Sequence, residues 1–275
     1  MKRYRVLGFD FDTRATILSQ EIGEYWEENV KESWQNNKDA VSKHLIYEFG
    51  EFAAEEKIEN FKDLGPKPFS VLAFHNTFLS DCRNAFTVAA YYPALTGACA
   101  LGERILNHLV LLLREDYKIT PEYKQVFRKE SFDNWNLAID TLVAWDVMLS
   151  GAADDFRQLA ILRNRSIHFR LEVDKDDRPL ALEAIKLLQR IVGNQFSFFG
   201  TQPWFIQTIR GEAYIKKSWE DKPFIRKVYL PNCALVGPKH HLDIINAKWT
   251  VHDNHVYPDK NISDDEFSHM RENKS

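Results

Sequence analysis

The chain has few cysteines and no excess of positive charge. Its three cysteines, Cys82, Cys99 and Cys233, are far apart and include no Cys-x-x-Cys pair. An odd number of widely spaced cysteines predicts reduced thiols in a cytoplasmic protein rather than a disulfide framework. The formal net charge of −4 offers no general basic surface, so any binding of nucleic acid must depend on a local patch.

Long apolar runs are also missing. The most apolar stretch, residues 109–113, lies between His108 and Arg114, whereas a membrane-spanning helix needs about 20 apolar residues. The basic stretch at 1–14 lacks the apolar segment of a secretory signal peptide. We therefore expect no membrane attachment.

What is present suits a globular protein with a mainly helical core. The 275 residues are 44% hydrophobic and 28% charged, which allows one sizeable core with appendages or two small domains. Successive segments of residues 70–195 have apolar residues at helical spacing and predict an up-and-down helical bundle. The segment 94–116 is apolar around most of a helical circumference, so we expect it at the centre of that bundle.

The segments on either side differ in composition. Residues 1–69 predict a short strand and a helical extension. Residues 196–258 hold five of the ten prolines and several β-prone runs, such as FIRKVYL at 224–230, and predict a small β-rich segment. The polar residues 259–275 predict a disordered tail. The expected fold class is mainly α, a helical bundle with an N-terminal helical extension and a small β-rich C-terminal segment.

One predicted helix, over 152–171, places polar residues inside an apolar run. On a helical wheel, Arg163 lies in the centre of the apolar stripe, and Asn164 and His168 share one edge of it. The stripe is formed by Phe156, Leu159, Ala160, Ile167 and Leu171. Because an unpaired buried charge is costly, Arg163 requires a carboxylate partner, a wet cavity or an anionic ligand. Glu103, Asp140 and Asp146 are candidate partners for an ion pair within the bundle, and His168 can equally be an ordinary core histidine.

The stretch Arg163-Asn164-Arg165-Ser166-Ile167-His168 resembles the Arg-polar-x-x-x-His motif of the HEPN superfamily. The fold of that family is a bundle of four or five helices with the motif on a late helix, and the resemblance covers about half of this chain. Members with an intact motif are metal-independent ribonucleases whose active site usually forms across a homodimer. The resemblance thus implies RNA as substrate, a homodimer through the motif helix and no cofactor or metal.

The resemblance also implies roles for individual residues. His168 would act as base or acid for the 2′-OH of RNA. Arg163 would hold phosphate oxygens with its planar fork, and Asn164 would orient the histidine ring or bind phosphate. Glu103 would be the additional acidic residue that some members carry on an earlier helix. The product would be a 2′,3′-cyclic phosphate, and Arg165 and Arg170 would contact the RNA backbone.

Families with this motif are often toxins or antiviral defence effectors, which implies an antitoxin or another regulatory partner. A second hypothesis is a non-catalytic module of the same fold that binds nucleotide or RNA, or serves in dimerisation. The acidic net charge favours this second hypothesis over an unselective ribonuclease.

Two further patterns receive weaker functional interpretations. GFDFDTR at 8–14 resembles the Asp-x-Asp motif of haloacid-dehalogenase-like phosphatases, but Arg14 stands where that motif has Thr or Val, and the motif requires a parallel sheet. A loose histidine cluster offers possible zinc ligands, which we interpret instead as surface side chains. Its members are His240, His241, Asp243, His252 and His255.

Overall fold

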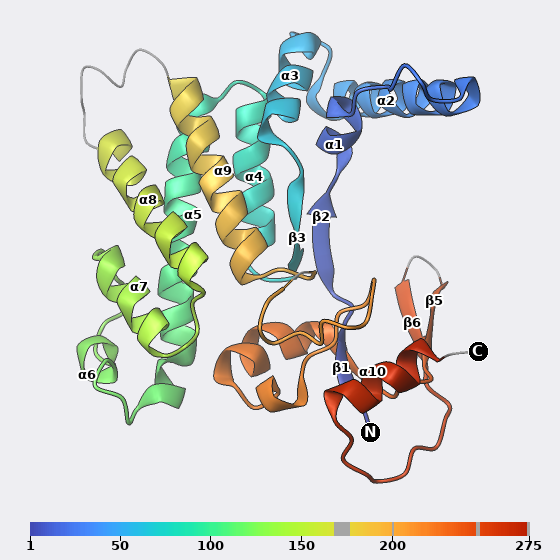
Figure 1. Ribbon diagram of the computed structural model, residues 1–275. Coiled ribbons are helices and arrows are strands. Elements are labelled where there is room, and N and C mark those ends of the chain that lie inside the picture. Colours follow the sequence, from blue (N-terminus) through green and yellow to red (C-terminus); the bar gives the residue numbers. More distant parts are fainter. Residues whose placement is uncertain (168–176, 200, 246–247, 274–275) are drawn as a thin grey trace.

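The computed structural model describes residues 1–167, 177–199, 201–245 and 248–273 (Figure 1). The protein is mainly helical, which confirms the predicted class. Its α-helices in these ranges are α1 (Arg14–Ser19), α2 (Glu28–Phe49), α3 (Ala54–Leu64), α4 (His75–Thr87), α5 (Tyr91–Leu113), α6 (Tyr123–Val126), α7 (Trp135–Ala144), α8 (Ser150–Ile167), α9 (Asp177–Gln195) and α10 (Asp264–Glu272).

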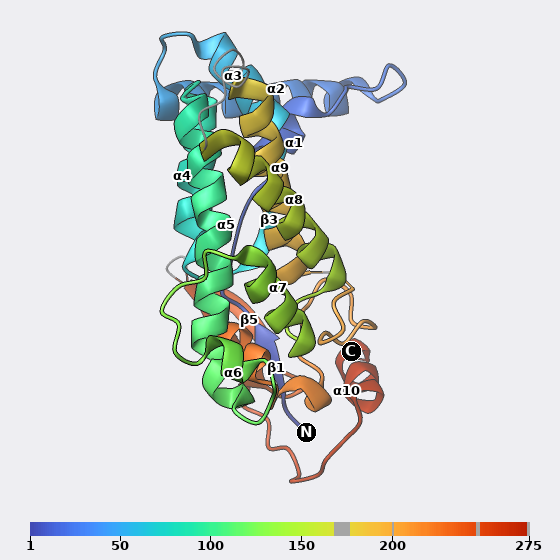
Figure 2. The same ribbon diagram turned by 90° about the vertical axis from the view of Figure 1, so that its left-hand side faces the viewer.

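Helix α5 is the centre of the bundle, as its apolar circumference predicts. It packs against α4, α7, α8 and α9, and the same arrangement is visible from the side in Figure 2. Leu95, Ile105 and Leu106 on α5 have no exposed surface. Pro93 lies in the first turn of α5, where its missing N–H costs no intrahelical hydrogen bond.

The strands in the described ranges form three antiparallel pairs. They are β1 (Arg3–Val6) with β4 (Cys233–Val236), β2 (Phe9–Asp12) with β3 (Lys67–Val71), and β5 (His241–Ile245) with β6 (Lys248–His252). The first pair joins the N-terminal segment to the C-terminal one. The second lies beside α4 (Figure 1).

The β-prone stretch 224–230 is helical rather than extended, so that detail of the β-rich expectation is wrong. It forms a π-helical turn over Ile225–Tyr229. Ile225, Val228 and Tyr229 are its buried residues, and their spacing of three and four is the spacing of one helical face rather than of alternating strand positions.

The main apolar core continues from the bundle into the C-terminal segment. Trp204 is only 1% exposed and belongs to the same buried cluster as α5. Its ring contacts those of Trp219, Phe224 and Tyr229 edge-on or tilted. Among the residues that the structure describes, no helix combines the length and apolarity that crossing a membrane requires.

The C-terminal tail is folded over most of its length, contrary to the expected disorder of 259–275. Ser263 and Glu266 form a reciprocal capping box at the start of α10, and Phe267 is completely buried in a second apolar cluster with Tyr214 and Val236. Arg271 pairs with Glu212. The polar composition of this segment did not predict the helix, because few of its residues, among them Phe267 and Arg271 on one helical face, attach it to the rest of the protein.

His75 at the start of α4 makes the fold sensitive to acid. Its side chain is fully buried, and neither ring nitrogen has a hydrogen-bond partner among the described residues. Burial lowers the pKa of His75 to about 3. In the unfolded chain this histidine binds a proton below pH ~6.5, whereas in the folded chain it binds one only below about pH 3. The free energy of unfolding therefore has its full value above pH ~6.5 and falls as the pH drops from there toward about 3.

We expect His75 alone to remove about 2 kcal/mol of unfolding free energy between pH 7 and pH 5. Urea unfolding at both pH values measures the loss, and His75→Leu is the variant that should flatten the dependence. Some dependence will remain, since burial also lowers the pKa of His240 to about 4. An identical pH dependence in wild type and variant would refute the assignment to His75.

Candidate functional site

The arginine of the motif stretch pairs with a carboxylate of the central helix. Arg163 Nη2 on α8 lies 2.9 Å from Glu103 Oε2 on α5, and the two side chains remain 28% and 30% exposed. Of the three candidate partners, Glu103 is therefore the one that the fold brings to Arg163, while Asp140 pairs with Arg157 instead. The pair lies at the edge of the core, in contact with solvent.

A buried tryptophan contacts both members of this ion pair. Trp135, the first residue of α7, is 4% exposed and its Nε1 donates a hydrogen bond to Glu103 Oε2 at 3.3 Å. The Cζ of Arg163 lies 5.8 Å from the centre of the Trp135 ring, within cation–π range. Helices α5, α7 and α8 thus each contribute one residue to a fixed polar cluster, which we call the Arg163 cluster: Glu103, Trp135 and Arg163.

The other motif residues are divided between described and undescribed parts of the chain. Asn164 and Arg165 are exposed at the C-terminal end of α8. His168 and Arg170 lie outside the described residues. The structure therefore brings Arg163 and Glu103 together. Asn164 and Arg165 directly follow Arg163 in the chain, and the position of His168 is not tested.

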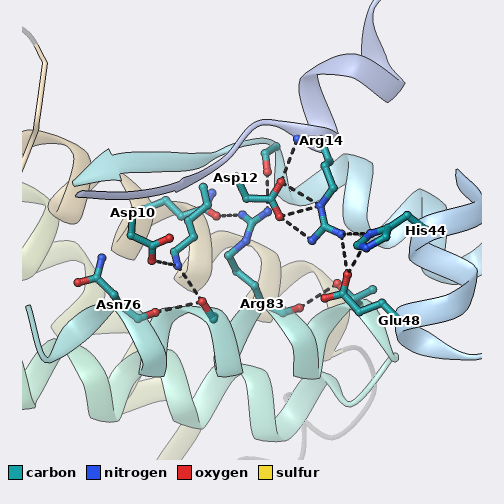
Figure 3. Close-up of polar contacts among 12 residues, drawn as sticks. Asp10, Asp12, Arg14, His44, Glu48, Asn76 and Arg83 are labelled. Carbon is teal, nitrogen blue, oxygen red and sulfur yellow. Dashed lines mark hydrogen bonds and ion pairs between the residues drawn. The ribbon is translucent and has the colours of Figure 1, made fainter. Parts of the chain in front are cut away.

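A second polar site, which the sequence did not predict, is a cavity between β2, β3 and α4. It has a volume of about 450 Å³, and Figure 3 shows the charged side chains around it. Asp10, Asp12 and Glu48 contribute negative charge, and Arg14, Lys67 and Arg83 contribute positive charge. It lies on the side of the bundle away from α8 (Figures 1 and 2).

Most of these charges are matched in pairs. Arg14 donates to Asp12 at 2.8 Å and to Glu48 at 2.6 Å, and Lys67 pairs with Asp10 and donates to Ser80. Burial opposes ionisation of Asp12, but the hydrogen bonds from Arg14 outweigh it and hold the pKa of Asp12 below its ordinary value. These contacts also fasten the N-terminal strand β2 to α2, β3 and α4.

Arg83 differs from the other cations of the cavity. It is 3% exposed and donates to two uncharged acceptors, the side chain of Gln189 and the carbonyl of Gly65. Burial lowers its pKa to about 10, so it remains charged at neutral pH. Among the ion pairs of the described residues, none joins Arg83 to a carboxylate. The cavity therefore contains a buried guanidinium that forms no direct ion pair within the described residues and that the Asp12 carboxylate attracts only at longer range.

The stretch GFDFDTR supplies five of the residues that line the cavity, residues 10–14, but not as a phosphatase motif. Its strand β2 pairs antiparallel with β3 in a two-stranded sheet, whereas the phosphatase interpretation requires Asp10 and Asp12 at the end of a central parallel strand. That interpretation is excluded. The charged residues Asp10, Asp12 and Arg14 lie close together in the sequence and could have indicated a polar site. The contributions of Lys67 from β3 and Arg83 from α4 depend on the tertiary fold.

No protein-family model, curated protein or solved structure matches the chain.

Proposed function

We propose that this protein is a metal-independent endoribonuclease of the HEPN type. The observation that carries the proposal is the position of Arg163, which is fixed by Glu103 and Trp135 yet still in contact with solvent. Two partners hold its guanidinium in place, and its partial exposure leaves it accessible to a ligand. An arginine that binds a substrate phosphate requires both properties.

The proposed reaction uses the nucleophile that RNA itself carries. His168 takes the proton of a 2′-OH, the oxygen attacks the adjacent phosphorus, and the 5′-oxygen of the next nucleotide leaves and receives a proton. The products are a 2′,3′-cyclic phosphate and a free 5′-OH. Arg163 holds the phosphate oxygens as negative charge accumulates on them, and Asn164 supports the histidine or the phosphate.

Glu103 serves in this proposal as a positioning residue. Its carboxylate accepts one hydrogen bond from Trp135 and lies against the Arg163 guanidinium, which restricts the rotamers of the long arginine side chain. Pre-ordering an arginine in this way reduces the entropy lost when it binds phosphate. Arg165 and Arg170 would add contacts to the RNA backbone.

The proposal includes a homodimer through the motif helix in the cytoplasm, with an antitoxin or similar partner as a regulator. Ile161 on α8 would lie in such an interface, since it is 61% exposed and three residues before Asn164, on the same face of the helix. Cleavage of RNA in EDTA by wild type, and its loss in motif variants, is the test.

The alternative is a non-catalytic nucleotide-binding module, and the cavity around Arg83 favours it. A volume of about 450 Å³ is within the range of small-molecule sites. A buried guanidinium without a carboxylate partner in the described chain provides the charge that would attract a phosphate group.

Binding of ATP or GTP, measured by calorimetry, tests this alternative. Arg83→Lys keeps the positive charge but loses the planar fork, so we expect at least a tenfold weaker affinity. Arg157→Lys, at an exposed arginine on α8, is the matched control. Absence of nucleotide binding in wild type would contradict the alternative, and the contacts around the cavity would then serve only to hold β2 in place.

A further inference from the structure

The β5–β6 hairpin gathers two histidines and an aspartate that are separated in the sequence. His241 is directly opposite His252 in the antiparallel register, and Asp243 follows two positions after His241. Because side chains alternate along a strand, all three project from the same face. The opposite face carries Leu242 and Val251, the latter packed against the apolar cluster of Phe267.

The geometry of the three side chains suits a shared set of metal ligands. The imidazole rings of His241 and His252 are nearly parallel, 10° apart with centroids separated by 4.8 Å. Their Nε2 atoms lie 4.0 Å and 3.1 Å from Asp243 Oδ2. One ligand atom from each of the three residues falls within 4.8 Å of the others.

A transition-metal ion would require only a small contraction of this group. Ligands at 2.0–2.2 Å in tetrahedral geometry are roughly 3.3 Å from one another. The side chains of His241 and Asp243 are 65% and 55% exposed, so they can rotate toward a common centre without disturbing the core. His252 Nε2 is enclosed and makes no well-formed hydrogen bond within the described chain. This nitrogen can therefore bind a metal through its lone pair, after losing a proton if it carries one.

We propose that His241, Asp243 and His252 bind one divalent transition-metal ion of the zinc class. Two imidazole nitrogens and one carboxylate oxygen suit Zn²⁺ and its neighbours rather than Mg²⁺ or Ca²⁺, which prefer oxygen ligands alone. Three protein ligands leave at least one coordination position for water. The site is separate from the Arg163 cluster and independent of the proposed ribonuclease activity.

The local structure gives such an ion a role. A two-stranded hairpin is marginally stable by itself, and Ile244 and Trp249 near its turn are 65% and 47% exposed, so packing supplies little support there. A metal that joins His241 to His252 across the strands would lock their register, and Asp243 would fix it along the strand. The ion acts as a clamp on the hairpin.

Equilibrium dialysis of the full chain, stripped of metal, against Zn²⁺ tests the proposal. We expect one tightly bound ion per chain and an increase in melting temperature on its addition. Asp243→Asn and His252→Ala should each weaken binding by more than about tenfold. His255→Ala is the matched control, because His255 is an exposed histidine of the same region outside the ligand set.

Cobalt(II) provides a second readout that does not depend on stability. Its visible absorption should indicate nitrogen and oxygen ligands in wild type and in His255→Ala, and should be lost in His252→Ala. Equal zinc affinity in all variants, or no stoichiometric binding in wild type, would overturn the proposal. RNA cleavage in EDTA is measured separately, so a negative result for the metal site does not contradict the proposed ribonuclease activity, and the reverse also holds.

Discussion

Replacing Arg163 with alanine is expected to reduce the rate of RNA cleavage by about 10²–10³-fold, the usual cost of removing one donor to a developing oxyanion. His168→Ala should cost about 10²–10⁴-fold, as expected for loss of a general base or acid. The measurement is cleavage of total tRNA and ribosomal RNA in EDTA, with detection of 2′,3′-cyclic phosphate ends. Of wild type and these two variants, only wild type should produce them at an appreciable rate.

Arg157→Ala is the control for this prediction. Arg157 is on the same helix as Arg163 and also forms an ion pair, with Asp140 at 2.9 Å, but it lies away from the motif. This variant should cleave at the wild-type rate. Equal cleavage by all the variants would identify a contaminating nuclease and return Arg163 to a structural role, while absence of cleavage in wild type would count against a constitutively active enzyme and favour the nucleotide-binding alternative.

Glu103→Gln separates positioning from chemistry. The amide keeps an oxygen that can accept from Trp135 but removes the charge that holds Arg163. If Glu103 only positions Arg163, its loss should reduce activity less than Arg163→Ala and leave the shape of the pH–rate profile unchanged. Disappearance of one limb of that profile would instead make Glu103 a proton-transfer group.

Replacing Phe267 with alanine is expected to lower the stability of the C-terminal region by about 3–5 kcal/mol, the usual cost of truncating a buried phenylalanine. Phe267 has no exposed surface, and its ring contacts Tyr214 edge-on at 5.1 Å. Its removal would leave α10 attached chiefly through polar contacts, among them the ion pairs of Arg271 with Glu212 and of Asp264 with Arg3. We therefore expect α10 to detach under conditions in which the bundle remains folded.

Limited trypsin digestion follows this detachment directly, because Arg271 lies on α10 and is 7% exposed in the folded chain. Phe267→Ala should be cut there much faster than wild type, and urea unfolding should show a new, early transition. Phe52→Ala is the matched control, since Phe52 is 89% exposed and loses almost no packing. Equal digestion of the two variants would mean that Phe267 does not anchor the helix.

Local sequence pattern determined the parts of this protein that depend on neighbours along the chain. Apolar periodicity located the helices between residues 70 and 195 and placed α5, which is apolar around most of its circumference, at the centre. The same periodicity put Arg163 on the core-facing stripe of α8, and the cost of burying its charge required a partner, for which Glu103 was a candidate. These inferences succeeded because helical geometry relates residues three and four apart without reference to the rest of the fold.

Only the tertiary structure decided which distant residues meet. The polar tail became a docked helix because Tyr214 and Glu212 receive Phe267 and Arg271. The strand register, which no single strand encodes, brought His252 opposite His241. The cavity depends on Arg83, whose hydrogen-bond partner Gln189 comes from another helix more than a hundred residues away. Such contacts depend on the free energy of the whole packed chain, so composition and periodicity do not predict them.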